Sequence, residues 1–378
     1  MRALVWFATL VLVACGNSGG DTGGSGGTAG SGGTAAGGGT AGTGSAGASG
    51  GTAGTGGAAG SGGTAGTGAA GGSGGASGGA GGSGGAGGAG GAGGAGGAGG
   101  GIGPCPGYAA GAPIGKVAFS AVTEASGIVE SRKTPGVFWV NNDSGDGPKL
   151  YAMTKDGAHR GVYTLGGAQA ADWEDIAIGP GPASGEVYLY VGDIGDNPAT
   201  RPNIKLYRVA EPKVATAGPA ATLTLGGVET FTYTYPDGPH NAETLLVDPV
   251  GGDAFIVVKA SSGKSPIFRA KSPLTSGVLE KVGELTFGAA PLTGGAATTG
   301  GEISPSGDAI LIRTYSSLYL WRRGAGMSVA QAFEGVACPV PQHAEPQGEA
   351  VCFGSDGAGY YTVSEGSQQP IYFFAKQP

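Results

Sequence analysis

Short apolar runs recur along residues 104–378, and their composition predicts strands rather than helices. Five such runs, each after a turn with Gly or Pro, lie at residues 137–140, 187–191, 254–258, 309–312 and 360–363. Val, Ile and aromatic residues bounded by Gly, Pro, Asn and Asp are typical of strands. Only residues 327–333 favour a short helix. The pattern therefore predicts an all-β domain.

The strands repeat in a fixed order. A run containing a Glu precedes each of these five strands, and a run with an aromatic residue follows at 149–153, 205–209, 266–270, 317–321 and 370–374. Looser fourth strands are expected at 161–165, 230–235 and 284–287. Groups of about four strands at periods near 50 residues are typical of a β-propeller, and a β-sandwich is the alternative.

The repeats predict a β-propeller of five or six four-stranded blades. Five copies are visible, and a sixth would lie in residues 210–235 or be shared between the two ends of the domain. Residues 116–120 are expected to pair with the last blade, because closing the ring removes an open sheet edge.

Three first-strand motifs carry a family resemblance. They are Glu124-Ala-Ser-Gly-Ile128, Asp172-Trp-Glu-Asp-Ile-Ala177 and Gln347-Gly-Glu-Ala-Val351, each ahead of a Gly-containing turn and a strand. In these motifs the domain resembles secreted bacterial propellers of the family labelled "esterase-like activity of phytase", and the related SdiA-regulated propellers, over most of residues 117–375. The resemblance implies a propeller and an esterase or phosphoesterase activity, and it assigns no catalytic residue.

The first residues are typical of an export signal. Arg2 is followed by an apolar run at residues 3–13, which has the length of a signal-peptide core and is too short to span a bilayer. The run ends in Leu12-Val13-Ala14-Cys15, which resembles the bacterial lipobox. We expect a lipoprotein signal peptide at residues 1–14 and lipidation at Cys15; an ordinary secretory signal is the alternative. The lipid would anchor the protein in the cell envelope, at the outer membrane or cell surface.

Residues 16–103 consist almost only of Gly, Ala, Ser and Thr, without an apolar side chain larger than Ala before Ile102. Such a segment cannot bury enough surface to offset its ordering entropy. We therefore expect residues 15–103 to be a disordered linker behind the lipidated cysteine, with a reach of roughly 50 Å, and residues 104–378 to fold. The formal net charge of −7 belongs almost wholly to that domain and argues against a nucleic-acid partner.

One Glu recurs in each first strand, at Glu124, Glu174, Glu243, Glu302 and Glu349. Innermost strands line the channel of a propeller, so we expect these side chains at the channel or its mouth. Gathered carboxylates repel one another unless they are protonated, hydrated or bridged by a cation. Oxygen donors suit Ca²⁺, which is the one cofactor that the sequence suggests. The alternative is that each Glu accepts hydrogen bonds from backbone amides of a neighbouring blade.

Further candidates follow the second strands. Asp143 and Asp193 lie in acidic, Gly-containing loops that resemble calcium loops but lack the distal Glu of an EF-hand; Asx turns would also explain them. Lys259 and Arg313 occupy the corresponding places in other repeats, so we expect them at the same rim, where they would neutralise the Glu residues, bind an anionic substrate or form salt bridges. His240 is the best candidate for a general base.

Three cysteines lie in the folded part, and an exported protein permits a disulfide. Cys338 and Cys352 close a short Pro-containing loop and are the expected pair, and Cys105 with Cys338 is the main competitor.

Two functions remain open from the sequence. The first is a surface-tethered binding module that recognises a small-molecule or protein ligand at the channel mouth. The second is a metal-assisted, Ca²⁺-dependent esterase or phosphoesterase that uses the same mouth.

Overall fold

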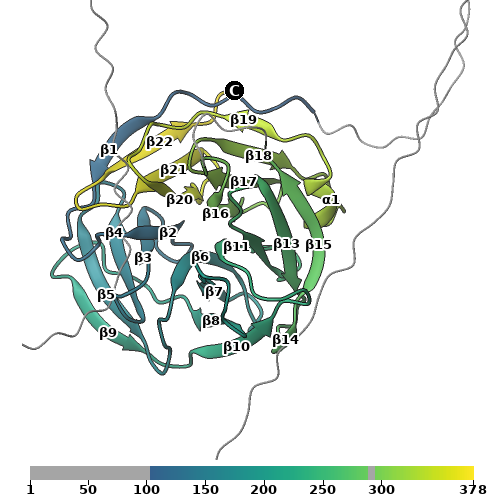
Figure 1. Ribbon diagram of the computed structural model, residues 1–378. Coiled ribbons are helices and arrows are strands. Elements are labelled where there is room, and N and C mark those ends of the chain that lie inside the picture. The colour runs from purple at the N-terminus through teal and green to yellow at the C-terminus, as the bar shows by residue number, and fades with distance from the viewer. Residues whose placement is uncertain (1–102, 288–293) are drawn as a thin grey trace, which may run out of the picture. The chain divides into compact units, whose positions relative to one another are not determined.

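Five sheets stand around a common axis in the computed structural model, which describes residues 103–287 and 294–378 (Figure 1). Their innermost strands contact one another in sequence, and the last of them contacts the first, so the ring is complete. The described part of the chain is therefore a five-bladed β-propeller, which confirms the predicted fold class.

The blades have these strands. Blade 1 holds β2 (Ala125–Glu130), β3 (Val137–Asn142), β4 (Lys149–Thr154), β5 (His159–Leu165) and β9 (Ala221–Leu225). Blade 2 holds β6 (Trp173–Pro180), β7 (Val187–Asp193), β8 (Ile204–Ala210), β10 (Glu229–Thr234) and β14 (Gly277–Val278). Blade 3 holds β11 (Ala242–Val247), β12 (Ala254–Val258), β13 (Lys264–Ala270) and β15 (Glu280–Thr286). Blade 4 holds β16 (Thr298–Ile303), β17 (Ala309–Thr314), β18 (Leu318–Arg322) and β19 (Cys338–Val340). Blade 5 holds β20 (Gly348–Phe353), β21 (Gly359–Ser364), β22 (Pro370–Ala375) and β1 (Ala112–Lys116).

Burial follows the distance from the axis. The innermost strands β2, β11, β16 and β20 are buried along their whole length, because both faces pack against neighbouring blades. Hydrophobic clusters fill the spaces between successive sheets; Leu206 of blade 2, for example, shares a cluster with Leu245 and Ile256 of blade 3. This packing holds the inner strands rigidly around the channel.

Residues 210–235 do not form a sixth blade. They supply β9, which adds parallel to the outer strand β5 of blade 1, and β10, which is the fourth strand of blade 2. A second parallel addition joins β14, from the chain of blade 3, to β10. Each addition ties a blade to its neighbour at the outer edge.

The ring is closed by a strand from the start of the domain. β1 pairs antiparallel with β22, with Lys116 opposite Pro370 (Figure 1). The predicted closure is confirmed, although the strand begins four residues before the expected one. The predicted short helix is also present as α1 (Val329–Phe333), whose first turn is closed by a capping box of Ser328 and Gln331.

The expected disulfide is wrong. Cys338 is bonded to Cys105, and Cys352 is a free, fully buried thiol. Although Cys338 and Cys352 are close in sequence, Cys338 lies in β19 at the outer edge of blade 4, and Cys352 lies in β20 at the inner edge of blade 5. The width of a blade separates them, whereas the segment with Cys105 runs along the perimeter beside β19 (Figure 1).

Candidate functional site

A β-bulge near the start of each first strand determines which side chain reaches the channel mouth. In β11, Ala242 pairs with Val258 and Thr244 with Val257, so Glu243 is the extra residue. A one-residue shift also occurs in the other four blades: the extra residues are Ser126, Thr299 and Glu349, and in β6 Glu174 and Asp175 together lie opposite Gly192. Bulges re-aim side chains and are common beside functional sites.

The predicted set of five Glu residues therefore needs correction, because only Glu174, Glu243 and Glu349 share this position. Glu124 precedes β2 and is exposed. Glu302 lies three residues beyond the bulge of β16, where it pairs with Arg132 at 3.1 Å and accepts the backbone N–H of Phe353 at 2.5 Å. Glu302 thus follows the alternative, in which a carboxylate binds an amide of the neighbouring blade.

Three carboxylates gather on one side of the mouth. Asp143 after β3, Asp172 before β6 and Glu174 within β6 each offer one oxygen, and these oxygens lie within 4.8 Å of one another. The Ser126 hydroxyl donates to Glu174 at 3.4 Å. The backbone passes close by at Gly195, where an added Cβ would lie 2.2 Å from Glu174 Oε1 and 2.5 Å from Asp172 Oδ2. We name Asp143, Asp172 and Glu174 the carboxylate cluster.

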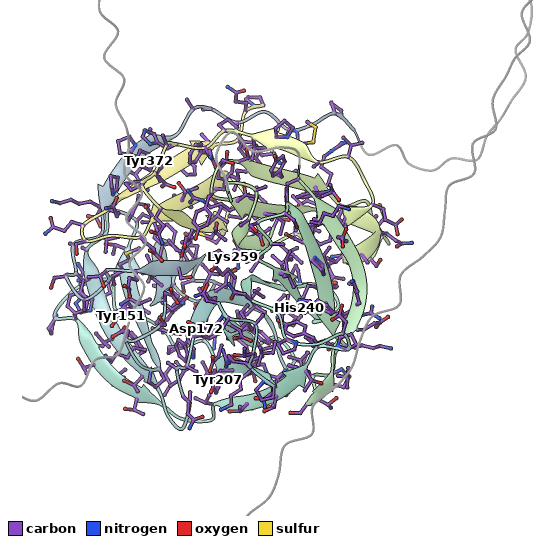
Figure 2. All side chains as sticks on the ribbon, viewed as in Figure 1. Tyr151, Asp172, Tyr207, His240, Lys259 and Tyr372 are labelled. Carbon is purple, nitrogen blue, oxygen red and sulfur yellow. A yellow bond between two sulfur atoms is a disulfide. The ribbon has the colours of Figure 1, made fainter. Side chains whose placement is uncertain are left out.

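A hydrogen-bonded chain occupies the other side of the mouth. Lys259 donates to a carboxylate oxygen of Glu243 and, at 2.8 Å, to the hydroxyl of Tyr315. That hydroxyl donates to Glu349 at 2.9 Å. The chain joins blades 3, 4 and 5, and Figure 2 shows Lys259 and Asp172 well inside the outer edge of the ring. Lys259 therefore neutralises part of the Glu set, as the sequence analysis expected.

Burial and mutual repulsion raise the pKa of several of these acids. Burial, and then Glu243 and Asp143, hold the pKa of Glu174 well above its usual range. Burial raises the pKa of Glu243 to about 8 although Lys259 opposes the shift. The pKa of Asp143 rises to about 6, chiefly by burial and with contributions from Asp172 and Glu349. The mouth thus gathers more carboxyl groups than Lys259 alone can keep ionised.

Two buried acceptors at the mouth have no donor. Oε2 of Glu243 and Oδ1 of Asn141 are buried, and neither accepts a hydrogen bond from any residue that the structure describes. The Glu243 side chain is only 5% exposed, and the Asn141 amide donates to the backbone oxygen of Glu174. Because buried acceptors are nearly always satisfied, these two atoms are candidates to bind a cation or a hydrogen-bond donor at the mouth.

Other predicted residues lie outside the carboxylate cluster. Asp193 pairs with Arg201 at 2.7 Å and accepts the backbone N–H of Asp172, so it positions the cluster without joining it. Arg313 is not on the rim as expected: it lies inside β17, pairs with Glu345 and donates to the backbone oxygen of Ala350. His240 bonds to Asp237 at 2.8 Å instead of to a cluster residue.

The sequence analysis missed Asp172, Tyr315 and Glu365. Tyr315 and Glu365 directly follow second strands at the places that Asp143 and Lys259 occupy in their own repeats, so a stricter alignment of the repeats would have found them. Burial and the neighbouring Glu349 raise the pKa of Glu365 to about 10.

Comparisons of the chain with protein-family models and with curated proteins find no match. The described residues include no helix with the length and hydrophobicity needed to cross a bilayer. The expected signal peptide, Cys15 and all of the expected linker except Gly103 lie outside the described residues.

Proposed function

We propose that this protein is a lipid-anchored β-propeller of the bacterial cell envelope that binds Ca²⁺ at its acidic mouth and, next to the ion, a small-molecule or protein ligand. The carboxylate cluster carries the proposal: three carboxylate oxygens lie within 4.8 Å of one another. The unpartnered, buried Oε2 of Glu243 supports it independently.

The chemistry of the donors favours calcium over other ions. All of the candidate ligands are carboxylate or amide oxygens, which hard cations prefer. The three carboxylates of the cluster come from three segments, namely the loop after β3, the loop before β6 and β6 itself. Such an irregular set suits Ca²⁺, which accepts 6–8 ligands in variable geometry, better than Mg²⁺, which demands a near-ideal octahedron.

Lys259 and Tyr315 give the ligand site its second half. Burial raises the pKa of Tyr315 far above its usual value, and Glu349 and Glu243 raise it further, so the hydroxyl keeps its proton. A protonated hydroxyl and an ammonium group beside a bound cation would bind an oxygen-rich group of a ligand. The same groups favour one second candidate, metal-assisted hydrolysis of an ester or phosphoester, because they could stabilise developing negative charge. Binding ranks first because His240, the expected base, is bonded elsewhere.

Calcium titration of the purified, chelator-treated protein tests the proposal. A ligand that binds only the native state raises the melting temperature, and 100-fold excess over Kd adds about 2.7 kcal/mol to the free energy of unfolding. We expect Ca²⁺ to raise the melting temperature of the parent and not that of Glu174→Gln, which keeps the side-chain shape and removes the charge.

The matched control is Glu302→Gln, since Glu302 is also a first-strand carboxylate but is held by Arg132 and an amide. This variant should keep the calcium response even if its own melting temperature changes. A parent that does not respond to Ca²⁺, or a response that Glu174→Gln retains, would contradict the cation site. Calcium-dependent hydrolysis of p-nitrophenyl esters or phosphates that Lys259→Met abolishes would instead favour the hydrolase.

A further inference from the structure

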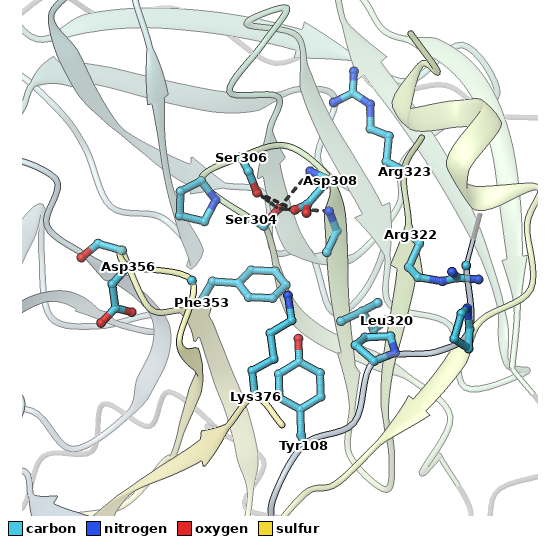
Figure 3. Close-up of a pocket in the computed structure, with 17 residues that line it drawn as sticks. Tyr108, Ser304, Ser306, Asp308, Leu320, Arg322, Arg323, Phe353, Asp356 and Lys376 are labelled. Atoms are coloured by element: carbon cyan, nitrogen blue, oxygen red, sulfur yellow. Dashed lines mark hydrogen bonds between the residues drawn. The ribbon is translucent and has the colours of Figure 1, made fainter. Parts of the chain in front are cut away.

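A cavity lies at the opposite end of the first strands from the carboxylate cluster. It encloses about 440 Å³ between blades 4 and 5. Its walls are the turns that follow β16 and β20, the end of β18, Lys376 after β22 and the segment around Tyr108 (Figure 3). Cavities of roughly 300–1,000 Å³ are typical of small-molecule sites.

Three side-chain donors in this cavity have no acceptor. Lys376, Arg322 and the hydroxyl of Tyr108 line it, and none of them makes a side-chain hydrogen bond or salt bridge to another residue of the described ranges. Nε of Arg322 is buried and has no acceptor among the described residues. Burial, and then Asp308, raise the pKa of Tyr108 to about 12, so its hydroxyl is a donor at neutral pH.

The other charged groups of the cavity each have at least one partner. Arg323 makes a bidentate pair with Asp248 at 2.6 and 3.0 Å. Asp308 accepts the hydroxyls of Ser304 and Ser306 at 2.7 and 2.5 Å, and Asp356 accepts the N–H of Ala358 at 2.9 Å. Each of these two carboxylates keeps one oxygen that accepts nothing from the described residues, but the donors of Lys376, Arg322 and Tyr108 outnumber these oxygens. The free donors favour a ligand that accepts hydrogen bonds, and an anionic acceptor makes the stronger bonds to them.

The walls define the rest of the ligand. Phe353 and Leu320 lie beside Lys376 and Tyr108 in Figure 3, and Pro104 and Pro106 complete an apolar lining. The two carboxylates Asp308 and Asp356 in the same cavity would repel a dianion such as a phosphate more strongly than a singly charged anion. We infer that this cavity binds a small organic carboxylate, with the carboxylate at Lys376, Tyr108 and Arg322 and an apolar body against Phe353 and Pro106.

The disulfide holds one wall of this site in place. Cys105 lies between the lining residues Pro104 and Pro106, and its bond to Cys338 in β19 fixes this segment against blade 4. Tyr108 forms an isolated β-bridge with Lys376, which sets these two donors side by side. The disulfide and the β-bridge thus hold this wall of the cavity in place.

Calorimetric titration of the full-length protein with 3-phenylpropionate tests the inference. We expect the acid to bind, and the isosteric neutral 3-phenylpropanamide to bind at least about tenfold more weakly, because hydrogen bonds to a charged group are the stronger ones. Lys376→Met keeps the apolar stem and removes the ammonium, and it should weaken binding of the acid by about tenfold or more. Lys264 is an exposed residue of β13, outside the cavity lining. Lys264→Met is therefore the matched control and should leave the affinity unchanged.

Several results would overturn the inference. They are no binding of the acid up to about 10 mM, equal binding of acid and amide, tighter binding of inorganic phosphate, or an unchanged affinity in Lys376→Met. A chelator should not alter the affinity, since the carboxylate cluster lies at the other end of the channel. The ligand site proposed for the cavity and the calcium site proposed for the mouth can therefore be disproved independently.

Discussion

At the scale of single residues, the bulge decides what reaches the mouth, and sequence similarity does not locate it. The sequence placed Glu174, Glu243 and Glu349 correctly because each occupies the bulged position. Glu302 shares with them only the sequence pattern of a Glu in a first-strand run. In β16, however, the glycines have another role: a Cβ on Gly300 would lie 2.6 Å from the backbone oxygen of Glu349, so Gly is required where blades 4 and 5 approach.

The raised pKa of Glu243 predicts a pH-dependent stability in chelator-treated protein. Its pKa rises from the ordinary 4.5 to about 8 on folding, chiefly through burial. The folded state therefore holds this proton more tightly than the unfolded state does. The resulting stabilisation is complete below the unfolded pKa and is lost as the pH rises through about 8.

Urea denaturation of the parent and of Glu243→Gln between pH 4.5 and 8 measures this effect. Relative to the variant, the parent should lose free energy of unfolding as the pH rises across that window. Glu284→Gln, on the exposed face of β15, removes one charge outside the mouth and serves as the control. Parallel profiles for the parent and Glu243→Gln would show that the Glu243 carboxyl is not perturbed by folding.

At the scale of elements, inner strands are easier to predict than outer ones. The second strands are apolar along most of their length because both faces are covered, and all five were found from their runs of Val, Ile and aromatic residues. The outer strands β9 and β15 face solvent and tolerate polar residues, so their sequence signal is weak. β9 and β14 pair with blades other than the one that their sequence position suggests, and no local pattern encodes such pairing.

The cysteines also pair by their elements and not by their distance in sequence, which yields a prediction about stability. The Cys105–Cys338 bond spans 233 residues and secures the segment that leads into the closing strand β1. Because Cys105 is exposed, Cys105→Ser removes the cross-link and little packing. We expect the variant to lose roughly 2–4 kcal/mol of unfolding free energy, since the cross-link restricts the unfolded chain.

Chemical denaturation with and without reductant checks this prediction. Reductant should lower the denaturation midpoint of the parent to that of Cys105→Ser and should not affect the variant. Peptide mapping without reduction provides an independent check, because a peptide that joins Cys338 to Cys352 would refute the observed pairing.

At the scale of the whole molecule, the two proposed sites lie at opposite ends of the first strands. The chain enters the propeller along residues 103–108, which form one wall of the cavity between blades 4 and 5 and lie away from the acidic mouth. The fold was predictable at this scale because five similar repeats can bury their faces only by packing in a ring.

The anchor is a prediction about the whole molecule that rests on the sequence alone. If Cys15 carries the lipid, its acyl chains hold the protein on a membrane, because each buried CH₂ contributes about 0.8 kcal/mol and two or more chains give stable anchoring. Cys15→Ser removes the attachment point and should move the protein from the membrane fraction to the soluble exported fraction, as measured by fractionation and immunoblotting. Cys105→Ser is the matched control, since it also replaces one cysteine and should leave the protein with the membranes. If Cys15→Ser stays with the membranes as well, the protein is held there by something other than a lipid on Cys15, and the proposed tethered display fails while both binding sites of the propeller remain to be tested on their own terms.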